Sequence, residues 1–187
     1  KVTLSGDGAD ELFGSYLSHR VAQPIYHMSH LDDEITQDDQ SETQDKLFDT
    51  RDREILKKLF EKSGGEELLW RYNLYLFTDE EKNELLTDTF KNQIRDIKTY
   101  NFIKHYFNNI TAKDPLNRIL EMEWNTQLPD HVLAFVDFLS MAHSIEVRSP
   151  FLDYRLVEFT ATISGDEKIR NGIIKDILKK SVETLLP

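Results

Sequence analysis

The 187-residue chain contains no cysteine, which excludes disulfide bonds, zinc thiolate sites and a cysteine nucleophile. This absence fits a reducing compartment, so we expect a cytoplasmic protein. No apolar run approaches the roughly 18 residues that a membrane-spanning helix needs, and we expect no membrane association. Basic residues are outnumbered, with 23 Lys and Arg against 34 Asp and Glu and a formal net charge of −11. This charge argues against nucleic-acid binding, which requires a basic face.

Glycine and proline are also scarce, with seven and five residues, so the composition is that of an ordinary globular protein. The length allows one large domain or two small ones, and we assign residues 1–187 to one portion of a single domain. Lys1 lies inside an expected strand and is not an initiator Met. We therefore expect the chain to be a piece of a longer protein.

Apolar periodicity predicts a mainly helical chain with one clear strand at its start. Capping signals are Thr78 with Glu81, Asp114 before Pro115, and Asp153. The acidic segment 32–54 is expected to be a solvated surface, with an interaction segment or a lid as the alternative. The strand is expected at 1–4 and the helices at 9–23, 53–62, 66–77, 79–86, one or two within 87–107, 115–128, 130–144, 154–163 and 173–186.

The stretch SGDGADE, residues 5–11, joins the expected strand to the first helix. A glycine turn at a helix start is typical of an anion site, but the carboxylates of Asp7, Asp10 and Glu11 would repel a phosphate. A divalent cation resolves the conflict, because Mg²⁺ binds one or two carboxylates together with phosphate oxygens. The alternative is that Ser5 and Asp7 only cap the helix.

A second group of charges lies among apolar residues between 137 and 153. Buried charges are usually paired, so a structural ion-pair network is the favoured interpretation and a substrate scaffold is the alternative. The members are Asp137, Glu146, Arg148 and Asp153.

Lys175 follows a turn and comes near a helix start, where a cation is disfavoured by the helix dipole. A bound anion would compensate, and a surface lysine is the alternative.

Three stretches together resemble the C-terminal synthetase domain of glutamine-dependent asparagine synthetases. The resemblance is strong over 1–23 and 124–187 and weak in the acidic middle. The stretches are SGDGADELFGSY, LPDHVLAFVDFLSMAHSIEVRSPFLDYRLVEF and KIRNGIIKDILKKSVETLLP.

The resemblance implies part of an α/β Rossmann-like domain of the nucleotide α-hydrolase type, mainly α here, with one or two of its strands. It also implies an ATP- and Mg²⁺-dependent ligase that activates aspartate as an aspartyl-adenylate and adds ammonia from glutamine. By resemblance, Ser5 and Gly6 approach ATP, and Asp10 binds magnesium and pyrophosphate. Asp7 is needed around the adenylate and ammonia steps, and Lys175 neutralises charge developing on the phosphates.

The chain departs from this family pattern at several points. The loop SGGxDS is absent, since the SGG at 63–65 is followed by EELL and is expected to be a turn. Phe138 replaces a usual Arg or Lys. Asp7 matches a family position that is Glu or Asp, and it is one methylene shorter than Glu. We therefore expect these 187 residues alone to be inactive. We also expect them to associate or to be marginally soluble, because a sheet edge and an apolar face are exposed.

Two alternatives stay open beside asparagine synthesis. One is a relative that adenylates another carboxylate, such as a β-lactam synthetase or a lasso-peptide cyclase. The other is a non-catalytic helical interaction module. The expected partners are small molecules, and a homodimer is left open.

Overall fold

The computed structural model describes residues 1–20, 22, 79–170 and 173–185, with residues 54, 57–58, 61–64, 68–69, 72 and 77 between them. The chain divides into two compact units. The first contains residues 1–22, 45–47 and 111–187, and the second contains 23–44 and 48–110. The acidic segment 32–54, apart from Glu54, lies outside the described residues, as do the Thr78 cap and the expected turn at 171–172. The assignment of 1–187 to a single domain portion stays a prediction.

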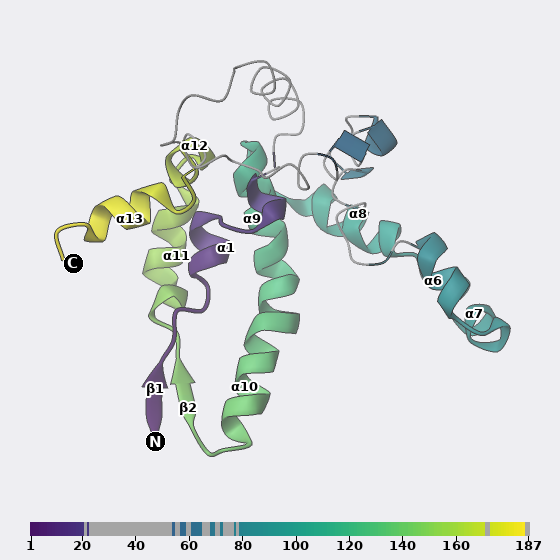
Figure 1. Cartoon of the computed structure of the whole chain (residues 1–187), viewed down its shortest axis with the longest axis horizontal. Coiled ribbons are helices and arrows are strands. Elements are labelled where there is room, and N and C mark those ends of the chain that lie inside the picture. The colour runs from purple at the N-terminus through teal and green to yellow at the C-terminus, as the bar shows by residue number, and fades with distance from the viewer. Residues whose placement is uncertain are drawn as a thin grey trace. The chain divides into compact units, whose positions relative to one another are not determined.

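A two-stranded parallel sheet lies in the first unit. Strands β1 (Val2–Leu4) and β2 (Glu146–Arg148) pair side by side with Val2 opposite Glu146 and Leu4 opposite Arg148 (Figure 1). A parallel pair needs a long crossover, and here the chain between residues 5 and 145 forms it. The apolar pattern predicts no helix or strand at 145–153, so β2 was missed from the sequence.

The rest of the first unit is mainly helical, which confirms the predicted class for the described residues. Its elements after β1 are α1 (Ala9–Phe13), α2 (Leu17–Arg20), α9 (Pro115–Asn125), the π-helical turn η1 (Leu128–Leu133), α10 (Ala134–Met141), the 3-10 turn η2 (Pro150–Leu152), α11 (Tyr154–Ala161), α12 (Gly165–Lys168) and α13 (Asp176–Val182).

The single helix predicted over 9–23 is wrong. Helix α1 ends at Gly14, whose φ of 77° is left-handed and stops the helix, and α2 starts after it. The helix predicted over 115–128 ends earlier, at Asn125, and Pro129 does not separate it from the next helix. Pro129 instead lies in the first turn of η1, where its missing N–H has no intrahelical partner to lose.

Two predicted caps are confirmed. The Asp114 carboxylate accepts a hydrogen bond from the backbone N–H of Asn117 at 2.9 Å, and α9 begins at Pro115. The Asp153 carboxylate accepts one from the N–H of Arg155 at 3.0 Å at the start of α11.

Helix α1 is at the centre of the first unit's core and packs against α9, α11 and α13. The Phe13 ring meets Phe151 edge-on with 6.3 Å between centroids. Each fully buried apolar side chain stabilises the fold by about 1.5–3 kcal/mol, so this core fixes the position of α1. The buried apolar residues of α1 and α9 are Ala9, Leu12, Phe13, Leu116, Ile119, Leu120 and Met122.

Three helices of the second unit have both ends within the described residues. These are α6 (Asp79–Leu85), α7 (Asp88–Ile94) and α8 (Thr99–Asn109). Ile103 and Phe107 of α8 are buried. None of the described helices in either unit is long and apolar enough to cross a membrane.

Candidate active site at the carboxyl ends of the strands

The carboxyl ends of β1 and β2 meet at one edge of the sheet. The backbone N–H of Ser5 donates to the carbonyl of Arg148 at 3.0 Å and continues the ladder beyond the strands. The hydroxyl oxygens of Ser5 and Ser149 then lie 3.1 Å apart. In open α/β sheets, ligands bind outside the carboxyl ends of the strands, so this edge is the first place to expect a site.

Gly8 connects this edge to α1. Its φ is 91°, and a Cβ at this position would overlap the side chain of Leu152. Only glycine fits this turn without strain. Gly6, two residues earlier, has nothing within 4 Å of the position its Cβ would occupy, so its backbone faces open space.

The described residues do not support the alternative in which Ser5 and Asp7 cap the helix. The N-cap of α1 is Gly8, and no side chain bonds to the first turn. The Ser5 hydroxyl donates to the Asp7 carboxylate instead, and accepts the Asp7 N–H at 3.2 Å. The dipole of α1 contributes little to anion binding at this turn, because the helix has only five residues.

Asp10 and Lys175 form an ion pair beside this turn. Lys175 Nζ lies 2.7 Å from Asp10 Oδ1, and both side chains are partly exposed. The Ser15 hydroxyl donates to the same oxygen. Burial favours the neutral acid, but the bonds from Lys175 and Ser15 outweigh it and hold the pKa of Asp10 below its usual value. Asp10 is therefore ionised at neutral pH.

Lys175 occupies a strained backbone conformation. It is the N-cap of α13 with φ 54° and ψ 35°, a left-handed region that non-glycine residues rarely adopt. Such strain persists only where the surroundings fix it, and it is frequent at functional sites. The position brings a cation from the end of the chain to the carboxylates at its start.

Oxygen atoms suited to a hard cation remain at this edge. Asp7 and Asp10 each keep one carboxylate oxygen that accepts no hydrogen bond from the described residues. Among the residues that the structure describes, no group of three or more acidic or histidine side chains could hold a metal. This set fits Mg²⁺, which usually takes one or two carboxylates and completes its shell with phosphate oxygens and water.

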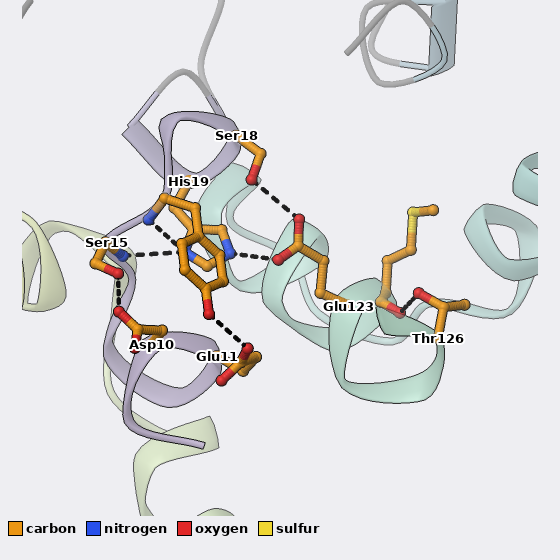
Figure 2. Close-up of polar contacts among 9 residues, drawn as sticks. Asp10, Glu11, Ser15, Ser18, His19, Glu123 and Thr126 are labelled. Carbon is orange, nitrogen blue, oxygen red and sulfur yellow. Dashed lines mark hydrogen bonds and ion pairs between the residues drawn. The ribbon is translucent and has the colours of Figure 1, made fainter. Parts of the chain in front are cut away.

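A buried network supports the turn that carries Ser15 (Figure 2). His19 and Glu123 are 2% and 0% exposed, and His19 Nε2 lies 2.6 Å from Glu123 Oε2. The backbone N–H groups of Ser15 and Tyr16 donate to His19 Nδ1 at 3.0 and 3.3 Å. Because Nδ1 accepts, the ring proton is on Nε2 and is donated to Glu123. The network thus ties the Ser15–Tyr16 turn to α9.

Tyr16 joins the network to α1. Its hydroxyl donates to Oε1 of the buried Glu11 at 3.0 Å. Burial and the negative charges of Glu11 and Asp10 raise the pKa of Tyr16, so it stays a neutral donor. Glu11, one of the three acids of the motif, therefore has a structural role here.

The charges between 137 and 153 form no continuous network. Arg148 pairs with Glu146 at 2.8 Å, and both are exposed. The Arg155 guanidinium lowers the pKa of the exposed Asp153 to about 2. Asp137 instead lines a cavity of about 250 Å³ together with Ser149, next to the strand ends.

Sequence reasoning missed Ser149, Ser15 and His19. A prediction of β2 would have found Ser149, since the residues after two paired parallel strands share one edge. Ser15 and His19 carried no local sequence signal. Ser15 bonds to Asp10 only because the chain turns back at this point, and His19 contacts the backbone of the same turn and a residue of α9.

A family model described as asparagine synthase matches residues 1–187. The chain belongs to the asparagine synthase family. Among curated relatives, it is 27% identical to asparagine synthetase [glutamine-hydrolyzing] 1 of Bacillus subtilis over 188 residues, covering all of this chain and 28% of that protein. It is 28% identical to a putative asparagine synthetase of Mycobacterium bovis over 196 residues, again covering 28% of it. No solved structure gives a significant match.

The chain thus spans little more than a quarter of the length of these relatives. The five residues that the resemblance singled out lie close to the strand ends or to the Asp10–Lys175 pair. Their roles stay predictions.

Proposed function

We propose that the protein containing this chain is an ATP-dependent ligase that converts aspartate to asparagine with ammonia drawn from glutamine. The family assignment and the names of the relatives support this proposal. The observation that assigns the proposal to particular atoms is the ion pair between Asp10 and Lys175 at 2.7 Å. Asp10 follows the turn in which Gly6 has no atom within 4 Å of its Cβ position.

We further propose that β1 and β2 belong to a larger Rossmann-like sheet. Both are short, parallel and largely exposed, whereas parallel sheets are normally covered on both faces. The ligand edge of such a sheet is where Ser5 and Ser149 lie. The absence of cysteine supports a cytoplasmic location. A homodimer is compatible with this proposal.

In the first proposed step, a side-chain oxygen of aspartate attacks the α-phosphorus of ATP. A P–O bond forms, and the bond from that phosphorus to pyrophosphate breaks. Lys175 donates one hydrogen bond to Asp10, and its two other N–H groups have no acceptor among the described residues, so they are available to the leaving pyrophosphate. Asp10 would hold magnesium, which would neutralise phosphate charge.

In the second step, the ammonia lone pair attacks the acyl carbon and AMP leaves with the C–O electron pair. The nitrogen must then lose a proton. The Asp7 carboxylate has a free oxygen at the strand edge and is the group we assign to stabilise and accept it. The Ser5 hydroxyl fixes the other Asp7 oxygen.

The test is aspartate-dependent pyrophosphate release by the intact protein, supplied with ATP, magnesium and ammonia. Lys175→Met should lower kcat/KM by roughly 10²-fold or more, the usual cost of removing a donor to developing negative charge. Lys179→Met, one turn along α13 and exposed, is the matched control and should retain activity. Equal activity of the two variants would contradict the assignment of Lys175.

The same assay separates the alternatives. Release that ignores aspartate indicates another carboxylate substrate, as in the β-lactam synthetase and lasso-peptide cyclase relatives. Absence of release under every condition indicates a non-catalytic module.

A further inference from the structure

A cavity of about 580 Å³ lies in the first unit. It is bounded by α1, by α9 with the residues before it, and by α11 and α12. None of Ser5, Gly6, Asp7, Asp10 or Lys175 lines it. Its volume is in the range of small-molecule sites.

A buried lysine lines this cavity. Lys168, the last residue of α12, is 2% exposed, and its Nζ donates to Asn117 Oδ1 at 2.6 Å. An ammonium carries three N–H donors, and Lys168 makes no other hydrogen bond and no ion pair within the described part of the chain. Buried charges are normally paired, so two unused donors at a cavity wall call for an acceptor.

The carboxylates around the same cavity are already engaged. Asp114 accepts the N–H and the side-chain amide of Asn117, at 2.9 and 2.5 Å. Glu121 accepts the N–H groups of Thr111 and Ala112, at 3.0 and 2.8 Å. Glu11 accepts the Tyr16 hydroxyl through Oε1, and its Oε2 accepts no hydrogen bond from the described residues. Lys168 has two N–H donors without an acceptor there, so an anionic group is the ligand that would satisfy this buried cation.

The remaining wall is apolar and partly aromatic. Leu12, Leu120, Trp124 and Val157 line it. A flat apolar group fits such a wall, since aromatic side chains provide large contact area, and the few polar groups then orient the ligand.

We propose that this cavity binds a small organic carboxylate with a flat apolar body, whose carboxylate bonds to Lys168 and whose body packs against Trp124. The site is distinct from the proposed ligase site and does not depend on that chemistry. It gives the protein a second small-molecule ligand.

The test uses phenylacetate as the probe and phenylacetamide as its neutral counterpart of the same shape. Binding to the intact protein is measured by calorimetry or ligand-observed NMR. Phenylacetate should bind at least about tenfold more tightly than phenylacetamide, because a charge-assisted hydrogen bond contributes about twice a neutral one. Equal affinities, or no binding of phenylacetate, would overturn the proposal without any variant being needed.

Variants then locate the probe. Lys168→Met should weaken phenylacetate by about tenfold or more and leave phenylacetamide unchanged, since it removes only the charge-assisted bond. Lys175→Met should leave phenylacetate binding unchanged. Loss of binding in Lys175→Met but not in Lys168→Met would place the probe in the ligase site and contradict the proposal. This result is independent of whether the protein makes asparagine.

Discussion

At the scale of single residues, the two glycines of the opening motif have different tasks. Gly8 is required by the backbone, because its φ is 91° and a Cβ would overlap Leu152. Gly6 has open space in front of it, which is what a residue that must let a ligand approach needs. The same residue type is thus needed for folding at one position and, by our proposal, for ATP at the other.

Alanine substitutions separate these tasks. Gly8→Ala should lower the free energy of unfolding by about 1–3 kcal/mol through strain and overlap. Gly6→Ala should change it by less than about 0.5 kcal/mol but reduce pyrophosphate release. Urea unfolding of the intact protein measures the first effect and the release assay the second. A stable Gly8→Ala protein would show that the turn is not fixed as described.

Lys168 gives stability a dependence on pH. Burial lowers its pKa to about 8, although the charge of Asp114 opposes the shift. Between this value and the unfolded value of about 10.4, the unfolded chain binds a proton that the folded chain has lost, so stability rises with pH. Urea unfolding should therefore show a rise across this window, and the rise should be absent in Lys168→Met. Lys179→Met is the control that should keep it, and a rise of equal size in Lys168→Met would contradict the account.

At the scale of elements, the turn between α1 and α2 depends on α9. His19 accepts two backbone N–H groups of that turn and donates to the buried Glu123. Ser15, which bonds Asp10, lies in the same turn. The site carboxylate is therefore held in place from a helix more than 100 residues along the chain.

His19→Ala should lower the free energy of unfolding by about 2–4 kcal/mol, because it removes a donor from a buried carboxylate and an acceptor from two N–H groups. His143→Ala, at an exposed histidine, should change it by less than about 0.5 kcal/mol. Denaturant unfolding of both variants checks the comparison. Equal small effects would show that the network contributes little.

Sequence reasoning succeeded where the signal is local. The caps at Asp114 and Asp153 depend on residues next to their helices, and both are confirmed. It failed where tertiary structure decides. Gly14 ends α1 within an apolar pattern that predicts one continuous helix. Glu146–Arg148 forms a strand because β1 lies beside it. Sequence alone predicts a site at the motif 5–11, and that assignment stays a prediction, whereas it gives no signal for Ser149 or His19.

At the scale of the whole molecule, large apolar side chains remain exposed in the first unit. They gather on the strands and on α10, and a parallel sheet is normally covered. This exposure supports the expectation that the 187 residues alone associate. The most exposed on these elements are Val2, Leu4, Phe135, Phe138, Leu139 and Met141.

Phe138→Lys offers a direct check of that expectation. Phe138 is 73% exposed, so the change should reduce association with an effect on stability below about 0.5 kcal/mol. Light scattering of the 187-residue chain at increasing concentration measures it. A clean monomer of the unchanged chain at high concentration would contradict the expectation of association.

The central claim is that the carboxylates of the opening motif serve the activation of aspartate. The most direct measurement is pyrophosphate release by the intact protein, with ATP, magnesium and ammonia, in the presence and absence of aspartate, for the unchanged protein and for Asp10→Ala. The account predicts release that requires aspartate and falls by roughly 10²-fold or more in the variant. Release that is independent of aspartate, or that persists in Asp10→Ala, would contradict it.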